Sequence, residues 1–174
     1  QTRSRDLGLR APVEPFTEIG QIATYYNRVM ESLQESRAGV DSILNTAVDG
    51  IITIDEKGIV HTFNPGAEKI FGYTKEEVAG KNVNLLMPSP HREEHDGHLQ
   101  RYLKTGEKHV IDTGQEVVGQ RKDGTVFPMF LSVDEMEVGG KKMFAGITRD
   151  ITELKKSEEM KQKAADELKK SYQE

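Results

Sequence analysis

The chain has 174 residues, of which 35% are hydrophobic and 30% are charged, and its net charge is −5. This length predicts one domain of ordinary size with polar flanking segments, and the acidic balance argues against a nucleic-acid surface, which needs a basic face. Because the chain has no cysteine, disulfides, thiolate zinc sites and cysteine nucleophiles are excluded.

Residues 16–47 predict a long amphipathic helix. Apolar residues recur along it at alternating spacings of three and four, which is the heptad seam of a coiled coil. The seam consists of Ile19, Ile22, Tyr26, Val29, Leu33, Ser36, Val40, Ile43 and Ala47. We therefore expect a parallel homodimer through this helix. An amphipathic helix that lies on its own domain is the alternative.

After this helix the hydrophobic period changes from 3.6 to 2, which indicates strands. The expected strands are residues 50–55, 59–64, 109–121, 125–137 and 142–150. The expected helices between the second and third strands are residues 66–71, a capped helix that begins at Thr74, and residues 91–104. This order predicts an α+β fold, a five-stranded antiparallel sheet with helices on one face.

The last segment, residues 153–174, consists almost entirely of charged or helix-favouring residues. It predicts a solvated helix with few apolar residues on one face. Such a helix pairs weakly, which suits a segment that relays a signal by changing its packing. The expected organisation is thus a tail and signalling helix over residues 1–40, a sensor domain over residues 41–152, and the start of a linker to an output domain over residues 153–174.

Four motifs carry a resemblance to a known family. They are residues 49–55 (DGIITID), 64–73 (NPGAEKIFGY), 121–125 (RKDGT) and 148–152 (TRDIT). In this order and at these spacings, they resemble the PAS family of sensory domains. The resemblance implies a sheet and facing helices that enclose a small-molecule cavity, with signals leaving through the C-terminal helix.

The N-terminal part carries a second resemblance. Residues 6–13 (DLGLRAPV), 17–22 (TEIGQI) and 26–30 (YNRVM) resemble the second half of a HAMP linker, although Thr17 stands where an aspartate is usual. The chain itself has no run of the roughly 20 apolar residues that a membrane span needs. The resemblance implies a cytoplasmic domain of a receptor anchored in the inner membrane by an upstream segment.

Three of the five histidines lie close together, at His91, His95 and His98. They fall on the expected helix 91–104, where positions three and four apart share a face. Three interpretations remain open from spacing alone. The histidines are incidental on a polar helix, or His91 and His95 bind a divalent metal with Glu94 or Asp96, or one histidine is the axial ligand of a haem.

Further motifs favour the haem interpretation. Residues 82–88, 95–96, 101–102, 109–111, 124–129 and 131–133 resemble the haem-binding, oxygen-sensing PAS domains of FixL-type sensor kinases. The resemblance implies haem b with His95 as the iron ligand, and Arg101 and His109 as contacts to the haem propionates. It also implies an apolar distal wall of Val110, Leu131 and Val133.

One position departs from the FixL pattern. Gln115 stands where that family has the arginine that hydrogen-bonds bound oxygen. A glutamine amide can still donate to a bound ligand but carries no charge. Oxygen, nitric oxide and carbon monoxide therefore all remain candidates.

The expected function is a haem-based gas sensor that passes its signal to an output such as the histidine kinase of a two-component system. The chain carries no phosphate-binding loop, no Ser/His/Asp set in a recognisable context and no kinase ATP-binding motif, so no enzyme is expected within it. A cofactor-free dimerisation or relay module is one alternative. A domain for another small ligand, such as a flavin or an organic acid, is a second, although without cysteine the flavin–cysteine adduct is excluded.

Overall fold

The computed structural model describes residues 18–106 and 114–171. These residues fall into two compact units, one that ends at Ile43 and one that begins at Leu44. Within the described ranges, no helix is long and apolar enough to cross a bilayer.

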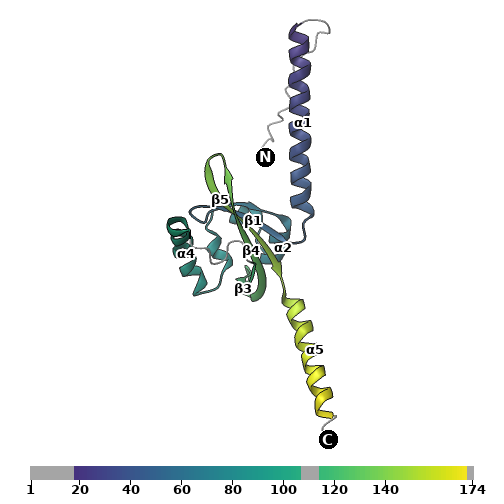
Figure 1. Ribbon diagram of the computed structural model, residues 1–174, viewed down its shortest axis with the longest axis vertical. Coiled ribbons are helices and arrows are strands. Elements are labelled where there is room, and N and C mark those ends of the chain that lie inside the picture. Colours follow the sequence, from purple (N-terminus) through teal and green to yellow (C-terminus); the bar gives the residue numbers. More distant parts are fainter. Residues whose placement is uncertain (1–17, 107–113, 172–174) are drawn as a thin grey trace. The chain divides into compact units, whose positions relative to one another are not determined.

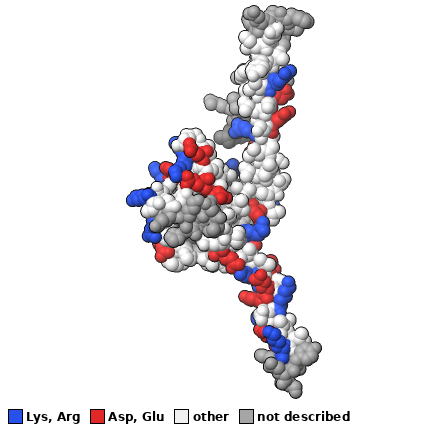
Figure 2. Space-filling view, viewed as in Figure 1, with Lys and Arg blue, Asp and Glu red and all other residues white. Residues whose placement is uncertain are grey.

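The first unit contains most of helix α1 (Glu18–Thr46). The helix confirms the prediction for residues 16–47 as far as the described residues reach. Large apolar side chains of the predicted seam are exposed along it, among them Ile22, Val29, Leu33 and Val40. Figure 2 shows few charged side chains on the visible face of α1. Residues 6–17 of the HAMP-like stretch lie outside the described residues.

The second unit is built on one antiparallel sheet, as predicted (Figure 1). Its strands are β1 (Gly50–Asp55), β2 (Val60–Phe63), β3 (Gln115–Gln120), β4 (Val126–Val138) and β5 (Lys141–Asp150). Their order across the sheet is β2-β1-β5-β4-β3. The first and last strands of the sequence therefore pair at its centre, with Gly50 opposite Thr148.

Four helical segments connect β2 to β3. They are α2 (Pro65–Phe71), α3 (Lys75–Val78), the 3-10 helix η1 (Val83–Leu86) and α4 (His91–Thr105). The capping box at Thr74 and Glu77 is confirmed, and α4 ends at Gly106, whose φ of +71° suits glycine. The short η1 was not predicted, because one 3-10 turn has no repeat to detect.

The core lies between the sheet and the short helices. Its buried apolar residues are Ile52, Val60, Phe63, Ala67, Phe71, Val78, Val83, Leu86, Phe127 and Met129. Phe71 of α2 is at its centre, with its ring 6.3 Å from that of Phe63 and 5.6 Å, edge-on, from that of Phe127. This packing positions α2 against β2 and β4.

Asn64 fastens the start of the domain. Its buried amide nitrogen donates to the carbonyl oxygens of Leu44 (3.1 Å) and Asp49 (3.0 Å). Its amide oxygen accepts from the backbone nitrogens of Ile51 (2.7 Å) and Ala67 (2.9 Å). One side chain thereby joins the last turn of α1, the start of β1 and the first turn of α2.

Two ion pairs lie at the C-terminal end of β5. The Arg121 guanidinium donates to the Asp150 carboxylate and to the Ile70 carbonyl, and lies 3.9 Å above the Phe127 ring. Two guanidinium nitrogens of Arg149 donate hydrogen bonds to the carboxylate of Asp49, at 2.8 and 2.6 Å. These pairs surround the point where β5 passes into the last helix.

The last helix, α5 (Thr152–Ser171), follows β5 directly. Its Lys155 makes an ion pair of 2.7 Å with Glu116 of β3. Charged side chains of both signs are dense along α5 (Figure 2). The prediction of a solvated helix is confirmed over its described residues.

Candidate functional site

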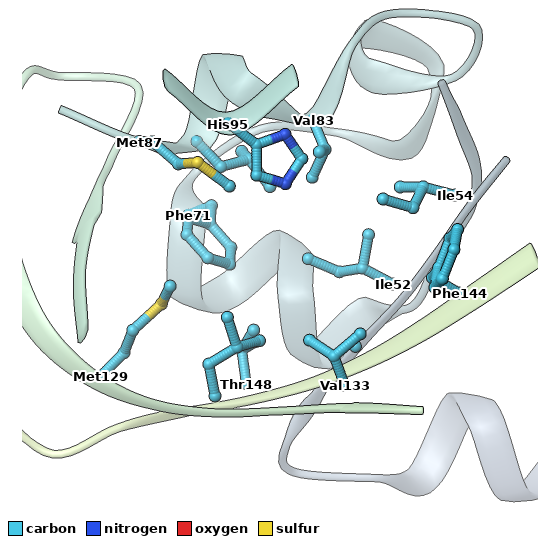
Figure 3. Close-up of a pocket in the computed structure, with 13 residues that line it drawn as sticks. Ile52, Ile54, Phe71, Val83, Met87, His95, Met129, Val133, Phe144 and Thr148 are labelled. Atoms are coloured by element: carbon cyan, nitrogen blue, oxygen red, sulfur yellow. The ribbon is translucent and has the colours of Figure 1, made fainter. Parts of the chain in front are cut away.

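A small cavity of about 70 Å³ lies between the sheet and the η1–α4 segment. Its walls are almost entirely apolar (Figure 3). The lining residues are Ile52, Ile54, Phe71, Val83, Leu86, Met87, His95, Met129, Leu131, Val133, Phe144, Gly146 and Thr148. Of the lining residues, only His95 and Thr148 have polar side chains, and the Thr148 hydroxyl donates to the Gly50 carbonyl oxygen at 3.2 Å.

His95 comes from α4, and its ring faces the cavity (Figure 3). Burial lowers the pKa of His95 below its ordinary value of 6.5, and the neighbouring Asp96 carboxylate, which raises it, offsets this only in part. Nδ1 lies 3.5 Å from the Asp96 carboxylate. The imidazole is therefore neutral near pH 7 and has a nitrogen lone pair to offer a metal.

Helix α4 is held by polar contacts at its surface. All of α4 is described, and none of its residues is fully buried, although His95 is half-buried. The Asn82 amide donates to both oxygens of Asp96, at 3.1 and 3.2 Å. Arg92 donates to the Gln120 side chain at 2.7 Å. The α4 wall of the cavity is thus tethered by exposed hydrogen bonds.

Two contacts fasten the second half of α4. The Tyr102 hydroxyl donates to the Glu135 carboxylate at 2.6 Å, and the Tyr102 ring packs edge-on against Phe144, 5.8 Å between centroids. Gln100 donates to the carbonyl oxygen of Glu56 at 3.2 Å. These contacts tie α4 to the β4–β5 hairpin and to the β1–β2 turn.

The structure brings together three of the predicted site residues. His95, Leu131 and Val133 all line the cavity. Arg101 is exposed on α4 and does not line it. Gln115 is half-buried at the start of β3, paired with Leu131, and is also not a lining residue. His109 and Val110 lie outside the described residues.

The divalent metal interpretation gains no support. His91 and His98 are exposed on α4. Within the part of the chain that the structure describes, no group of three or more histidine, aspartate or glutamate side chains is arranged to hold a metal ion. A haem needs only one protein ligand to iron, so His95 alone meets that requirement.

Sequence reasoning missed several lining residues, above all Thr148 and Phe144 of β5. A signal for them was present. Side chains alternate faces along a strand, so the strand pairing that puts Leu131 opposite Thr148 also puts both on the cavity side. Threonine is common in strands, however, so Thr148 cannot be recognised as a lining residue from the sequence unless the strand register is known.

The chemistry of the cavity walls suits a haem, but the cavity is too small to hold one. A neutral imidazole and apolar walls suit the group, whereas cofactor sites usually have about 300–1,000 Å³. The cavity of about 70 Å³ is well below that range. A tetrapyrrole therefore requires one wall to move outward, and α4, with no fully buried residue, is the wall that can move at least cost.

The chain was compared with known proteins. It is 42% identical, over 81% of its length, to the protein named Sensor protein FixL of Bradyrhizobium diazoefficiens, and spans 28% of that protein. It is 29% identical to the cell-division control histidine kinase PdhS of Brucella ovis, over 74% of this chain and 12% of that one. The chain thus spans less than a third of these relatives.

Solved structures agree with the fold. The PAS domain of an HTR-like protein from Haloarcula marismortui superposes with a TM-score of 0.60 at 21% identity, over 72% of this chain and 99% of that one. A PAS domain from Colwellia psychrerythraea gives 0.56 at 24% identity, over 70% and 98%. The PAS domain family model matches residues 48–153, which is more than half of the chain. The chain therefore belongs to the PAS domain family.

Proposed function

We propose that this chain is the sensory PAS domain of a signal-transduction receptor that binds haem b through His95 and responds to a diatomic gas. The observation that carries the proposal is the imidazole of His95, which faces an apolar cavity (Figure 3). The similarity to a protein named Sensor protein FixL, at 42% identity, supports it.

Different residues of this chain would have different roles in binding the haem and the gas. A bound haem would supply an iron atom as the binding position for a gas. His95 would bind the iron, and Leu131 and Val133 would keep the gas side of the cavity dry. Arg101 and His109 would contact the propionates, and Val110 and Gln115 would lie near the gas.

The output is proposed from the relatives. The Brucella relative is named a histidine kinase, and we propose that α5 passes the signal to such a domain in the same chain. We also propose a sensor segment over residues 41–152 between two signalling helices, in the cytoplasm, below an inner-membrane anchor. The HAMP-like residues 6–33 support the anchor.

The test is the absorption spectrum of protein loaded with haemin and freed of excess. The wild type should show a Soret band, and His95→Ala should lose it or show the spectrum of unligated haem. His98→Ala is the matched control, because His98 is exposed on the same helix, and it should keep the wild-type spectrum. A wild type without the band, or an unchanged band in His95→Ala, would contradict the proposal.

We also propose a homodimer through α1, supported by its exposed apolar seam. A glutamate at Leu33 would place two carboxylates in the seam of a parallel pair. Leu33→Glu should therefore shift the molar mass measured by light scattering from dimer to monomer. Glu35→Gln, beside the seam, should leave the dimer intact. A dimer that survives Leu33→Glu would place the interface elsewhere.

The size of the cavity favours one other candidate, a cofactor-free relay domain. A volume of about 70 Å³ is far below that of cofactor sites. In that case, the domain would connect α1 and α5 mechanically and bind no haem. A colourless protein after haemin loading, still dimeric by light scattering, would favour this candidate.

A further inference from the structure

The start of α5 is fastened to the sheet by buried contacts. Ile151, just before the helix, is 6% exposed, and its backbone nitrogen donates to the carbonyl oxygen of Pro128 on β4 at 3.2 Å. The Asp150 carboxylate accepts from the backbone nitrogen of Thr152 at 2.8 Å and is itself paired with Arg121. Moving this point would expose a buried side chain, so the helix has a fixed start.

A second fastening, one turn further along α5, is an exposed ion pair. Lys155 Nζ lies 2.7 Å from the carboxylate of Glu116 on β3, and the two side chains are 38% and 58% exposed. Among the described strands, β3 is at the edge of the sheet. An exposed ion pair of this kind shifts an equilibrium by roughly fivefold at most. The second fastening can therefore open while the first stays closed.

Glu116 also relates this ion pair to the cavity. Side chains alternate faces along a strand, so Glu116 and its neighbour Gln115 lie on opposite faces of the sheet. Gln115 pairs with Leu131, which lines the cavity, whereas Glu116 pairs with Phe130, which is 41% exposed on the other face. A displacement of the start of β3 relative to β4 would therefore act on both the cavity wall and Lys155.

Lys155 has a second carboxylate near it. Glu158 lies three positions further along α5, and residues three apart are neighbours on a helix surface. The hydrogen bond to Glu116 raises the pKa of Lys155 above its ordinary 10.5, and the charge of Glu158 adds a smaller rise. When the bond to Glu116 opens, the ammonium group therefore still has a carboxylate beside it on its own helix.

We propose that the Glu116–Lys155 ion pair is a clamp that holds α5 in one of two directions. With the clamp closed, α5 is fixed to both β3 and β4. With the clamp open, α5 pivots about Ile151, and Lys155 pairs with Glu158 instead. This inference rests on the proposed role of α5 in passing the signal. It places the charged signalling contact on the face of the sheet away from the cavity, one residue from Gln115.

The test measures the direction of α5 by the distance between two spin labels. Because the chain has no cysteine, Glu76→Cys on α3 and Lys163→Cys on α5 give two unique labelling positions, both exposed. Labelled protein is diluted with unlabelled protein, so that a homodimer carries labels on one chain only. Double electron–electron resonance then gives the distribution of distances between the labels.

At low salt, the labelled parent should show mainly one distance. Glu116→Gln and Lys155→Gln should each raise the population at a second distance by up to about fivefold, and about 1 M salt should do the same to the parent by screening the charges. Exchange of the charges, Glu116→Lys with Lys155→Glu, should restore the parent distribution. Lys156→Gln is the matched control, because Lys156 pairs with Glu153 of α5 itself, and it should leave the distances unchanged.

Equal distributions in the labelled parent, Glu116→Gln and Lys155→Gln would overturn the clamp, and so would a charge exchange that restores nothing. Far-ultraviolet circular dichroism checks that each variant is folded. These measurements need no bound haem. The haem proposal is therefore judged separately, by the Soret band of the same proteins after haemin loading.

Discussion

The two walls of the cavity are built in opposite ways. The sheet wall is fixed by buried side chains, with Met129, Phe144 and Thr148 each no more than 4% exposed. The opposite wall, α4, has no fully buried residue and is held by exposed hydrogen bonds and by the packing of the half-buried Tyr102 ring against Phe144. The wall that carries His95 is therefore the less firmly attached of the two.

The contacts that hold the two walls also differ in energy. Burying a large apolar side chain contributes about 1.5–3 kcal/mol, whereas an ordinary hydrogen bond contributes only about 0.5–1.5 kcal/mol net. A shift of α4 exchanges its surface bonds for bonds to water at small cost. A shift of the sheet breaks its ladder and its core. We infer that any enlargement of the cavity takes place on the side of α4.

The largest expected effect comes from the sheet side. Phe127 is 3% exposed and packs against Phe71 and Arg121. Phe127→Ala should lower the free energy of unfolding by about 3–5 kcal/mol, through lost burial and the cavity left behind, as measured by urea denaturation. Phe130→Ala is the control on the same strand, because Phe130 is 41% exposed. Similar losses in both variants would contradict a core on one face of the sheet.

A smaller loss of stability is expected at acid pH, where the Asp49 carboxylate just before β1 takes up a proton and loses its charge. Hydrogen bonds from Arg149 hold the pKa of Asp49 below its ordinary 3.8. The unfolded chain therefore binds this proton first as the pH falls. The stabilisation is complete above 3.8 and disappears as the pH falls through the lower pKa of the folded protein.

Asp49→Asn checks this expectation. Its free energy of unfolding, measured by urea denaturation between pH 6 and pH 2, should fall less steeply than that of the wild type. Asp134→Asn, an exposed aspartate on β4, should keep the wild-type dependence. If Asp49→Asn follows the wild-type curve at every pH, the Asp49–Arg149 pair does not stabilise the fold.

The smallest effect is expected on α4. Tyr102→Phe removes the hydrogen bond to Glu135 and keeps the ring against Phe144. The free energy of unfolding should fall by only about 0.5–1.5 kcal/mol. Hydrogen exchange followed by mass spectrometry should nevertheless become faster in α4 and stay unchanged in β1 and β5. Equal acceleration in the sheet would show that both walls open together.

The sheet was predictable because its signals are local. Alternating apolar residues and glycine turns gave β1 with its observed bounds, and β4 and β5 within one residue of theirs. The short α2 followed from Pro65 and ended as expected at Phe71. Each of these elements carries its own start or stop residue, so no knowledge of the tertiary fold was needed.

The site was predictable only in part. Periodicity cannot tell which of three histidines on a polar helix faces inward, and the resemblance to FixL-type sensor kinases selected His95. Leu131 and Val133 followed from the same resemblance. The roles of Arg101 and Gln115 stay predictions, because neither lines the cavity. Thr148 was not predicted as a lining residue, because its position beside Gly50 depends on pairing between strands nearly 100 residues apart.

The pairing of Gly50 with Thr148 has a consequence for modular use of the domain. The chain enters the sheet at Gly50 and leaves it after Asp150, on neighbouring strands. A domain whose two ends lie this close can be inserted into another protein with little disturbance of its host. Grafts cut at residues 47 and 152 should therefore carry the cavity intact into foreign receptors.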